Sequence, residues 1–268
     1  MIVAATRYLI GMSTKMYFSH ARTLQWCRDV AELSRRHPAV TTGTVELFVL
    51  PGFLSITEVA KIIPSVGAQD VSWAEEGPYT GEVSAAQLAE VGARFVEVGH
   101  AERRRLFGED DAIVAAKTAA VLRHGLAPVL CVGETDRGTP RQALEFCQAQ
   151  IDAALASARQ HSLRGRVVIA YEPVWAIGAA EPAAAGYITE VCGPLRTWLA
   201  QDTNIAGAVI YGGSAGPGLL RQIGEHVDGL FLGRFAHDAR AISGILDDIS
   251  FLTGTDPADS PRRPRSSR

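Results

Sequence analysis

The sequence is poor in lysine and cysteine and contains no long apolar run. No stretch reaches the ~18 apolar residues that a membrane-spanning helix requires, and the first residues lack the apolar core of a signal peptide, so we expect a cytoplasmic protein. The cysteines form no C-x-x-C pair, which argues against a zinc or redox motif and favours reduced thiols: Cys27, Cys131, Cys147 and Cys192. The only lysines are Lys15, Lys61 and Lys117.

A strong excess of charge is also absent. The formal net charge of -3 provides no field for nucleic acid or for a membrane surface, and we expect neither as a partner. The 268 residues, 47% of them hydrophobic, suffice for one large core. We therefore expect one domain over residues 1–255. Residues 256–268 are rich in Pro, Ser, Asp and Arg without apolar periodicity, and we expect a disordered tail there.

Short apolar segments rich in β-branched residues alternate with longer segments of helical periodicity. Residues 23–35, 112–123 and 142–158 have the helical pattern. Eight such units predict an α/β fold, a (β/α)8 barrel of eight parallel strands ringed by helices. An open doubly wound sheet is the alternative, but residues 11–15 are not its glycine-rich turn. The predicted strands are Tyr8–Gly11, Glu46–Leu50, Ser65–Ala68, Phe95–Val98, Ala127–Val132, Val167–Tyr171, Ala208–Tyr211 and Gly229–Leu232.

One nine-residue segment, Ala170–Gly178, places a carboxylate, a proline and a glycine at the end of a predicted strand. Glu172 stands where the strand stops, which in a parallel barrel is the face of catalysis. Pro173 fixes φ and stiffens the loop, and Gly178 offers a backbone N–H that an anion can approach closely. A carboxylate base beside an anion-binding loop indicates proton abstraction from a phosphorylated substrate.

Other chemically useful residues also follow predicted strands. Lys15 follows the first and His100 the fourth, and two glycine-containing turns, 212–214 and 233–234, follow the last two, where barrels frequently bind phosphate. Moving a carbonyl between adjacent carbons needs a base, an electrophile and a fixed positive charge, which Glu172, His100 and Lys15 can supply. This chemistry requires no metal or other cofactor, and we expect none.

Each of these residues also has a purely structural interpretation. Lys15 can be a solvated loop residue and His100 a hydrogen-bonded structural histidine. Glu102 suits the first turn of a helix, Ser214 can cap the next helix, and Cys131 can be a packing residue. The functional interpretation gains weight because Lys15, His100, Glu172 and Ser214 all fall at strand carboxyl ends of one architecture.

Several segments, in this order from about Tyr8 to Leu252, resemble motifs of the triosephosphate isomerase family. Besides Ala170–Gly178, they are Gly77–Glu82, Val98–Arg104, Cys131–Thr135, Tyr211–Ser214 and Val227–Gly229. The resemblance implies a TIM barrel and an aldose–ketose isomerase of glycolysis and gluconeogenesis. It implies Lys15, His100 and Glu172 as the catalytic residues, with Glu102 supporting Lys15. His100 would act as a neutral imidazole, a pairing with glutamate for which triosephosphate isomerase is itself the known example.

The resemblance also implies a substrate site and an assembly. Phosphate would be held by backbone amides of Gly178, Ser214 and the turn at Gly233. A homodimer is implied, with the loop at Thr80 reaching into the neighbouring subunit. Further substrate-binding residues are expected at Ser13, Gly212, Gly213 and Arg234.

The chain departs from the family's pattern at several of these places. The family usually has Asn-Trp-Lys-Met-Asn where residues 13–17 read Ser-Thr-Lys-Met-Tyr, and Ser where Ala101 follows the catalytic histidine. Asp70 stands for Asn, the lid continues Gly178-Ala179-Ala180-Glu181-Pro182 in place of Gly-Thr-Gly-Lys, and Arg234 stands for Gly. An arginine beside the phosphate turn is a feature in which the chain resembles the branch that isomerises L-erythrulose 1-phosphate. We expect the Arg234 side chain to lie along the pocket wall or to contact a carboxylate such as Asp238.

Three functions follow from this comparison. Interconversion of dihydroxyacetone phosphate and glyceraldehyde 3-phosphate is the leading expectation. Isomerisation of a four-carbon ketose phosphate such as L-erythrulose 1-phosphate is the close alternative. A non-catalytic paralogue that binds a sugar phosphate is the third.

Overall fold

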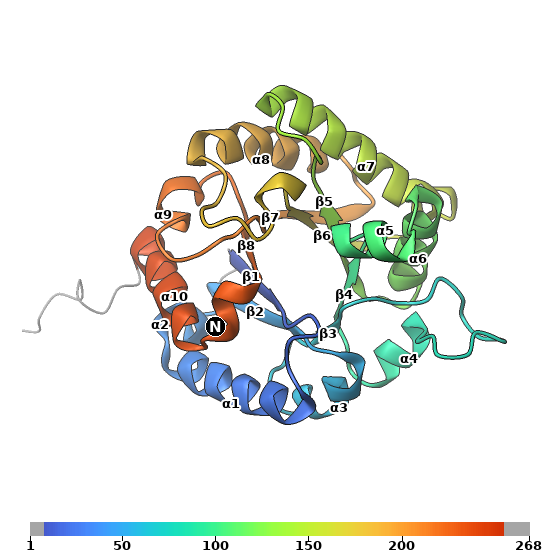
Figure 1. The fold of residues 1–268 in the computed structure, drawn as a ribbon, viewed down its shortest axis with the longest axis horizontal. Helices are drawn as coiled ribbons and strands as arrows, with labels where there is room; N and C mark the ends of the chain where they lie inside the picture. The colour runs from blue at the N-terminus through green and yellow to red at the C-terminus, as the bar shows by residue number, and fades with distance from the viewer. Residues whose placement is uncertain (1–7, 255–268) are drawn as a thin grey trace, which may run out of the picture.

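The computed structural model describes residues 8–254, in which eight strands form one parallel sheet of order β2-β1-β8-β7-β6-β5-β4-β3 (Figure 1). A bridge between Val49 and Val66 joins the two ends of this sheet and closes the barrel. All eight predicted strands are confirmed, three of them with the predicted bounds. The strands are β1 (Tyr8–Ser13), β2 (Val45–Leu50), β3 (Gly67–Ala68), β4 (Phe95–Val98), β5 (Ala127–Val132), β6 (Gly165–Tyr171), β7 (Ile205–Tyr211) and β8 (Gly229–Leu232).

Helices surround the barrel. The three predicted helices are confirmed, and each begins one to three residues before its apolar pattern because polar caps precede it. Before α7, for example, Thr139 and Gln142 form a capping box and Pro140 occupies the first turn. The helices are α1 (His20–Arg36), α2 (Pro38–Thr41), α3 (Ile56–Val59), α4 (Ala85–Glu90), α5 (Ala101–Phe107), α6 (Asp111–Arg123), α7 (Pro140–Gln160), α8 (Ala185–Leu199), α9 (Leu220–Ile223) and α10 (Arg240–Thr253), with 3₁₀ turns η1 (Phe53–Ser55), η2 (Val174–Ala176) and η3 (Arg234–His237).

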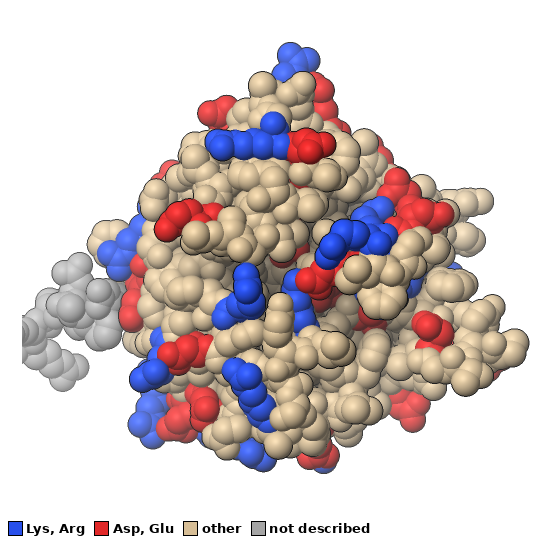
Figure 2. Space-filling view, in the orientation of Figure 1, with Lys and Arg blue, Asp and Glu red and all other residues tan. Residues whose placement is uncertain are grey.

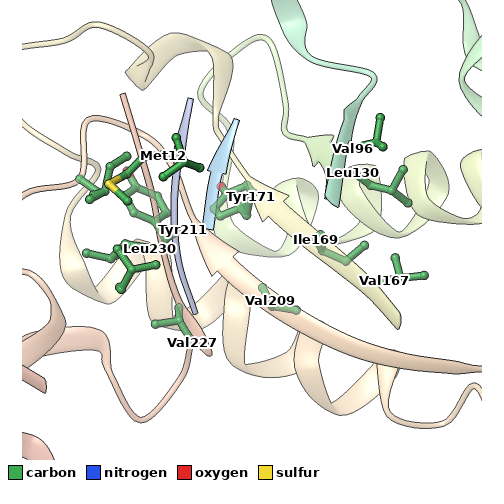
Figure 3. Close-up of a cluster of buried hydrophobic side chains, with 14 of the residues drawn as sticks. Met12, Val96, Leu130, Val167, Ile169, Tyr171, Val209, Tyr211, Val227 and Leu230 are labelled. Atoms are coloured by element: carbon green, nitrogen blue, oxygen red, sulfur yellow. The ribbon is translucent and has the colours of Figure 1, made fainter. Parts of the chain in front are cut away.

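The outer face of the barrel packs against the helices. Alternate strand residues such as Met12, Ile169 and Leu230 belong to a large buried apolar cluster between sheet and helices (Figure 3). Because side chains alternate along a strand, the residues between them point into the barrel. Apolar burial of this kind is the main stabilising contribution to the fold.

The barrel interior is a separate apolar core that includes the aromatic rings of Phe48, Phe95 and Phe231. Phe48 of β2 stacks on Phe95 of β4 with ring centroids 4.4 Å apart. Gly11 of β1 provides the room for this, because a Cβ there would lie 2.2 Å from the Phe48 ring. The same alternation aims Ser13 and Glu172 into the barrel above this core, at its carboxyl end.

No helix within residues 8–254 is long and apolar enough to cross a bilayer. The predicted tail, residues 256–268, lies outside the described residues.

Candidate active site

A cavity of about 1190 Å3 opens at the carboxyl ends of the strands. Figure 2 shows a hollow near the centre of the barrel, with Lys and Arg atoms beside it. A second cavity, of about 720 Å3, is lined by residues of α8, β7 and the chain that follows α9, and it holds none of the predicted site residues. The larger cavity brings together Ser13, Lys15, His100, Glu102, Glu172, Gly178, Gly212, Ser214, Gly233 and Arg234. Gly213 lies next to it, where its carbonyl accepts a hydrogen bond from Tyr211.

Lys15 lies in a strained loop directly after β1. Its φ of 44° is in the left-handed region, which costs a residue with a side chain about 1–2 kcal/mol. The side-chain amide of Gln69 holds the loop, since it donates to the hydroxyl of Thr14 at 3.1 Å and to the carbonyls of Lys15 and Leu50 at 3.1 and 2.9 Å. This strain places the Lys15 ammonium in the cavity.

Glu102, in the first turn of α5, pairs with Lys15 at 2.8 Å. Burial alone would lower the pKa of Lys15, but the hydrogen bond and the charge of Glu102 outweigh it and the pKa is raised. The lysine is therefore a permanent cation. Glu102 thus occupies the helix start and contacts Lys15, and its part in catalysis stays a prediction.

His100 caps the helix that carries Glu102. The Nδ1 atom of His100 accepts a hydrogen bond from the backbone N–H of Glu102 at 3.1 Å, so the ring proton resides on Nε2. The Nε2 atom lies 3.4 Å from Oε2 of Glu172. Burial, followed by the charge of Lys15, lowers the pKa of His100 to about 4. The imidazole is thus neutral at physiological pH, with its N–H aimed at the cavity.

Glu172 follows β6 directly and carries a buried carboxylate. Its Oε2 atom has no hydrogen-bond partner among residues 8–254, and Ala101 has no hydroxyl to provide one. A Cβ on Gly212 would lie 2.4 Å from the Glu172 side chain, so the glycine leaves room for the carboxylate. Burial raises the pKa of Glu172 to about 7, while the charge of Lys15 opposes the shift. The group is poised to exchange a proton near neutral pH.

The loop of residues 173–183, which corresponds to the lid of the family, is held by hydrogen bonds at three points. At its start, the Trp175 indole donates to Glu134 at 2.8 Å. In the middle, the Ser214 hydroxyl donates to the carbonyls of Ala176 and Ala179, both at 3.0 Å. At its end, the Ala183 N–H donates to the Tyr211 hydroxyl at 3.0 Å. The interpretation of Ser214 as a helix cap is wrong, because α9 begins only at Leu220 and Ser214 holds the lid.

Arg234 spans the cavity mouth to the lid. Its Nη2 atom donates to the carbonyl of Gly178 at 3.5 Å, and the residue lines the cavity. The prediction that Arg234 contacts Asp238 is wrong, since Asp238 forms an ion pair with Arg240 at 3.0 Å. Arg240 follows Asp238 by two residues, and this local contact prevails over the longer reach to Arg234.

The departure at Asp70 belongs to a charge network beside the site. Lys117, which is buried, contacts Asp70 at 2.5 Å and Glu109 at 2.6 Å. Arg103 of α5 contacts the same two carboxylates at 2.9 and 2.7 Å. Two cations therefore compensate two anions, and the network connects the loop after β3 to the helix that carries Glu102. Asp70 therefore helps to hold α5 against the loop after β3.

Glu97 is a buried acid that the sequence analysis missed. It is 4% exposed and points into the barrel from β4, where its Oε2 atom accepts a hydrogen bond from the Ser13 hydroxyl at 3.1 Å. The signal was available, because an acid interrupts the apolar strand Phe95–Val98 at a position that alternation directs inward. Burial, then the charge of Glu172, raises the pKa of Glu97 to about 8. Cys131, expected to pack, also lines the cavity and lies 3.9 Å from Glu97.

A parallel barrel with a buried carboxylate, a neutral imidazole and a lysine around one cavity contains the groups that an isomerase acting by proton transfer requires. Residues 8–254 contain no group of three or more His, Cys, Asp or Glu side chains that could hold a metal ion. The family profile of triosephosphate isomerase matches residues 8–249. The chain belongs to the triosephosphate isomerase family.

Relatives with two activities are similar to the chain. An L-erythrulose-1-phosphate isomerase of Pectobacterium atrosepticum is 50% identical over 256 residues, which cover 94% of this chain and 99% of that protein. A protein of the same name from Rhizobium rhizogenes is 37% identical over 262 residues, covering 93% and 96%. A triosephosphate isomerase of Mycobacteroides abscessus is 41% identical over 239 residues, covering 84% and 90%.

Proposed function

We propose that the chain isomerises L-erythrulose 1-phosphate, the alternative of the sequence analysis, in preference to dihydroxyacetone phosphate. The observation that carries this proposal is the 50% identity to an L-erythrulose-1-phosphate isomerase over nearly the whole length of both chains. The similarity to a triosephosphate isomerase is lower and covers less of the chain, so the three-carbon reaction ranks second. The presence of Lys15, His100 and Glu172 around one cavity argues against a non-catalytic paralogue.

The substrate fits one chemical route. L-Erythrulose 1-phosphate carries its phosphate on C1, its carbonyl on C2 and a hydrogen and a hydroxyl on C3. Glu172 removes the C3 proton to give an enediolate over C2 and C3. The proton returns to C2 and the hydroxyl proton moves from O3 to O2, so the carbonyl lies on C3 in the numbering of the substrate. Numbered from its other end, this product is erythrulose 4-phosphate. No oxidant or reductant is consumed.

The neighbouring groups stabilise the enediolate in this proposal. The Nε2–H of His100 faces Glu172 at 3.4 Å, which suits a donor to the oxygens on C2 and C3 while the base works on the carbon. Lys15 supplies a fixed positive charge in the same cavity. Neutral imidazole as the electrophile is the arrangement established for triosephosphate isomerase.

Phosphate is placed by the turns after the last three strands. Gly178, Ser214 and Gly233 line one side of the cavity, and glycine-containing turns let backbone N–H groups approach an anion. Arg234 adds a guanidinium at this side, and its contact with the Gly178 carbonyl couples it to the lid. The lid then excludes water from the enediolate, which limits loss of phosphate by elimination.

The proposal is tested by steady-state rates on purified protein with both ketose phosphates. We expect kcat/KM for L-erythrulose 1-phosphate to exceed that for dihydroxyacetone phosphate by about tenfold or more, the scale on which one small group is discriminated. A preference for dihydroxyacetone phosphate would instead make the chain a triosephosphate isomerase.

The ionisation of Glu172 predicts the pH profile. Only the carboxylate can accept a proton, and its pKa is raised by burial to about 7, so kcat/KM should rise with pH through about 7 and then level off. At pH 6 only about a tenth of the sites would be active. His100, with its pKa lowered to about 4, stays neutral throughout this range.

The substrate phosphate titrates near pH 6 as well. Its pKa is obtained from the phosphorus NMR shift of free substrate and is separated from the profile by fitting both ionisations. A profile that is flat from pH 5 to 9 after this correction would place the base elsewhere.

A homodimer is a further prediction. The loop between β3 and α4, which contains Thr80, projects away from the barrel (Figure 1). It carries the exposed aromatic residues Trp73 and Tyr79, and elsewhere Met16 and Leu54 are 98% and 91% exposed. Two exposed aromatic side chains on one projecting loop support the proposal that this loop contacts a second subunit.

We expect the wild type to sediment with twice the mass of one chain and Thr80→Arg to sediment as a monomer, because a charged, bulky group is forced into the contact. The matched control is Phe146→Arg on α7, which changes another exposed site and should leave the dimer intact. A monomeric wild type, or a dimeric Thr80→Arg variant, would contradict this assembly.

A further inference from the structure

A departure from the family pattern meets a buried acid inside the barrel. Ser13 replaces the asparagine usual in the family, and its shorter side chain donates a hydrogen bond to Glu97 at 3.1 Å. Both residues are about 95% buried, and they come from β1 and β4, which are not neighbours in the sheet. The pair therefore crosses the interior of the barrel above the aromatic core.

The pair borders the catalytic groups. The Oε1 atom of Glu97 lies 3.9 Å from Nε2 of His100 and 3.9 Å from Sγ of Cys131. Ser13, His100 and Cys131 all line the cavity, and Glu97 lies directly behind this lining, within 3.1–3.9 Å of the three side chains. A carboxyl group buried in this position costs free energy unless it is hydrogen-bonded, and the Ser13 hydroxyl provides one such bond.

The topology places the pair away from the phosphate turns. In the closed barrel, β4 lies four strands from β8, which is the opposite side. A substrate whose phosphate is held at the turn of Gly233 and whose reacting carbons lie at Glu172 extends its remaining carbon toward β4. In L-erythrulose 1-phosphate that remaining carbon is C4, a hydroxymethyl group. Dihydroxyacetone phosphate has a hydrogen in its place.

We infer that Ser13, which lines the cavity and is positioned by its hydrogen bond to Glu97, forms with that buried carboxyl a subsite for the terminal hydroxymethyl group of the four-carbon substrate and so determines chain-length specificity. This inference rests on the proposed function. The serine hydroxyl both donates and accepts, and a carboxyl group that holds its proton does the same, so together they can satisfy a hydroxyl inside the barrel. Burial raises the pKa of Glu97 to about 8 and that of Glu172 to about 7, so between these values Glu97 holds its proton while Glu172 acts as a base.

The three-carbon substrate makes no use of this subsite. Its reacting carbons and phosphate meet the same Glu172, His100 and Lys15, but it has no hydroxymethyl group to reach Ser13 and the Glu97 carboxyl behind it. Removing the subsite should therefore penalise the longer substrate selectively. A group that acted on the chemistry itself would affect both substrates alike.

The test measures kcat/KM on L-erythrulose 1-phosphate and on dihydroxyacetone phosphate for the wild type, Glu97→Leu, Glu97→Gln and Ser13→Ala. We expect Glu97→Leu to lower the ratio of the two values by about tenfold or more, and Glu97→Gln, which keeps a donor and an acceptor, to retain most of it. Ser13→Ala should shift the ratio in the same direction. Circular dichroism shows whether Glu97→Leu folds. If it does not, Ser13→Ala tests the subsite on its own.

The outcomes separate the two claims. If the wild type prefers L-erythrulose 1-phosphate but Glu97→Leu and Ser13→Ala lower both rates by the same factor, or neither rate, the subsite is overturned and the proposed function stands. If the wild type prefers dihydroxyacetone phosphate, the proposed function fails and the subsite fails with it. A ratio that falls in both apolar variants and recovers in Glu97→Gln supports the subsite.

Discussion

The Glu172→Gln variant should lose isomerase activity by about 10²–10⁴-fold in kcat, the usual loss when a general base is removed. The amide has nearly the same shape but cannot accept a proton. It fits the same space, which Gly212 leaves open at the end of β6. Substrate binding should change little, because the phosphate turns and Lys15 are untouched. Activity within a few-fold of wild type would remove Glu172 from the role of base.

The fold should survive this substitution and gain stability at alkaline pH. The pKa of Glu172 is raised in the folded chain from 4.5 to about 7, so the folded state binds more protons than the unfolded state between these values. The stability of the wild type therefore falls as pH rises through this window, and the Gln variant is free of that loss. Thermal unfolding at pH 8 should show a midpoint at or above that of the wild type. A lower midpoint would mean that the carboxylate stabilises the barrel.

The Lys15→Ala variant should bind phosphorylated ligands about 10–100-fold more weakly, as expected for loss of a hydrogen bond from a charged group. Both KM and the dissociation constant of phosphoglycolate, an anionic mimic of the enediolate, should rise. Titration calorimetry with phosphoglycolate separates this effect from chemistry.

The chain provides a matched control for Lys15. Lys61 is an exposed lysine whose ammonium contacts Glu58 at 2.7 Å and which lies outside the cavity. Lys61→Ala should leave phosphoglycolate affinity unchanged. Equal affinities for wild type and Lys15→Ala would make Lys15 a loop residue only.

The fold was predictable because the sequence repeats one local pattern eight times. The strands β4, β5 and β8 have the predicted bounds, since apolar residues and turn residues mark both ends. The start of β7 was placed three residues late: Ile205 is followed by Ala206 and Gly207, which have low strand propensity. Pairing with β6 over its whole length holds these residues in the sheet, a tertiary effect that local pattern does not encode.

The site was predictable to the extent that it lies at strand ends. Lys15, His100 and Glu172 meet because parallel strands deliver their carboxyl ends to one face. Side chains that act through distant partners were harder to find. Glu134 receives three donors, from Tyr171, Trp175 and Tyr187, and nothing local in the segment Gly133–Thr135 indicates them.

The departures from the family pattern could be seen in the sequence but not explained by it. The loss of asparagine at Ser13 was recognised, yet its partner Glu97 lies 84 residues away on a strand that read as apolar. Likewise Asp70 is compensated by Lys117, 47 residues away. Such pairs depend on which strands and helices adjoin the same space, and only the assembled barrel defines that.

The most direct test of the central claim follows L-erythrulose 1-phosphate by proton NMR in D2O with the wild-type enzyme. Proton transfer through an enediolate at Glu172 predicts conversion to a ketose whose carbonyl has moved to C3, with solvent deuterium on C2, because the proton held by the carboxyl exchanges with water before it returns. Glu172→Gln should abolish both conversion and exchange. Conversion that keeps the original hydrogen entirely, as in a hydride shift, or no conversion of this substrate at all, would contradict the account.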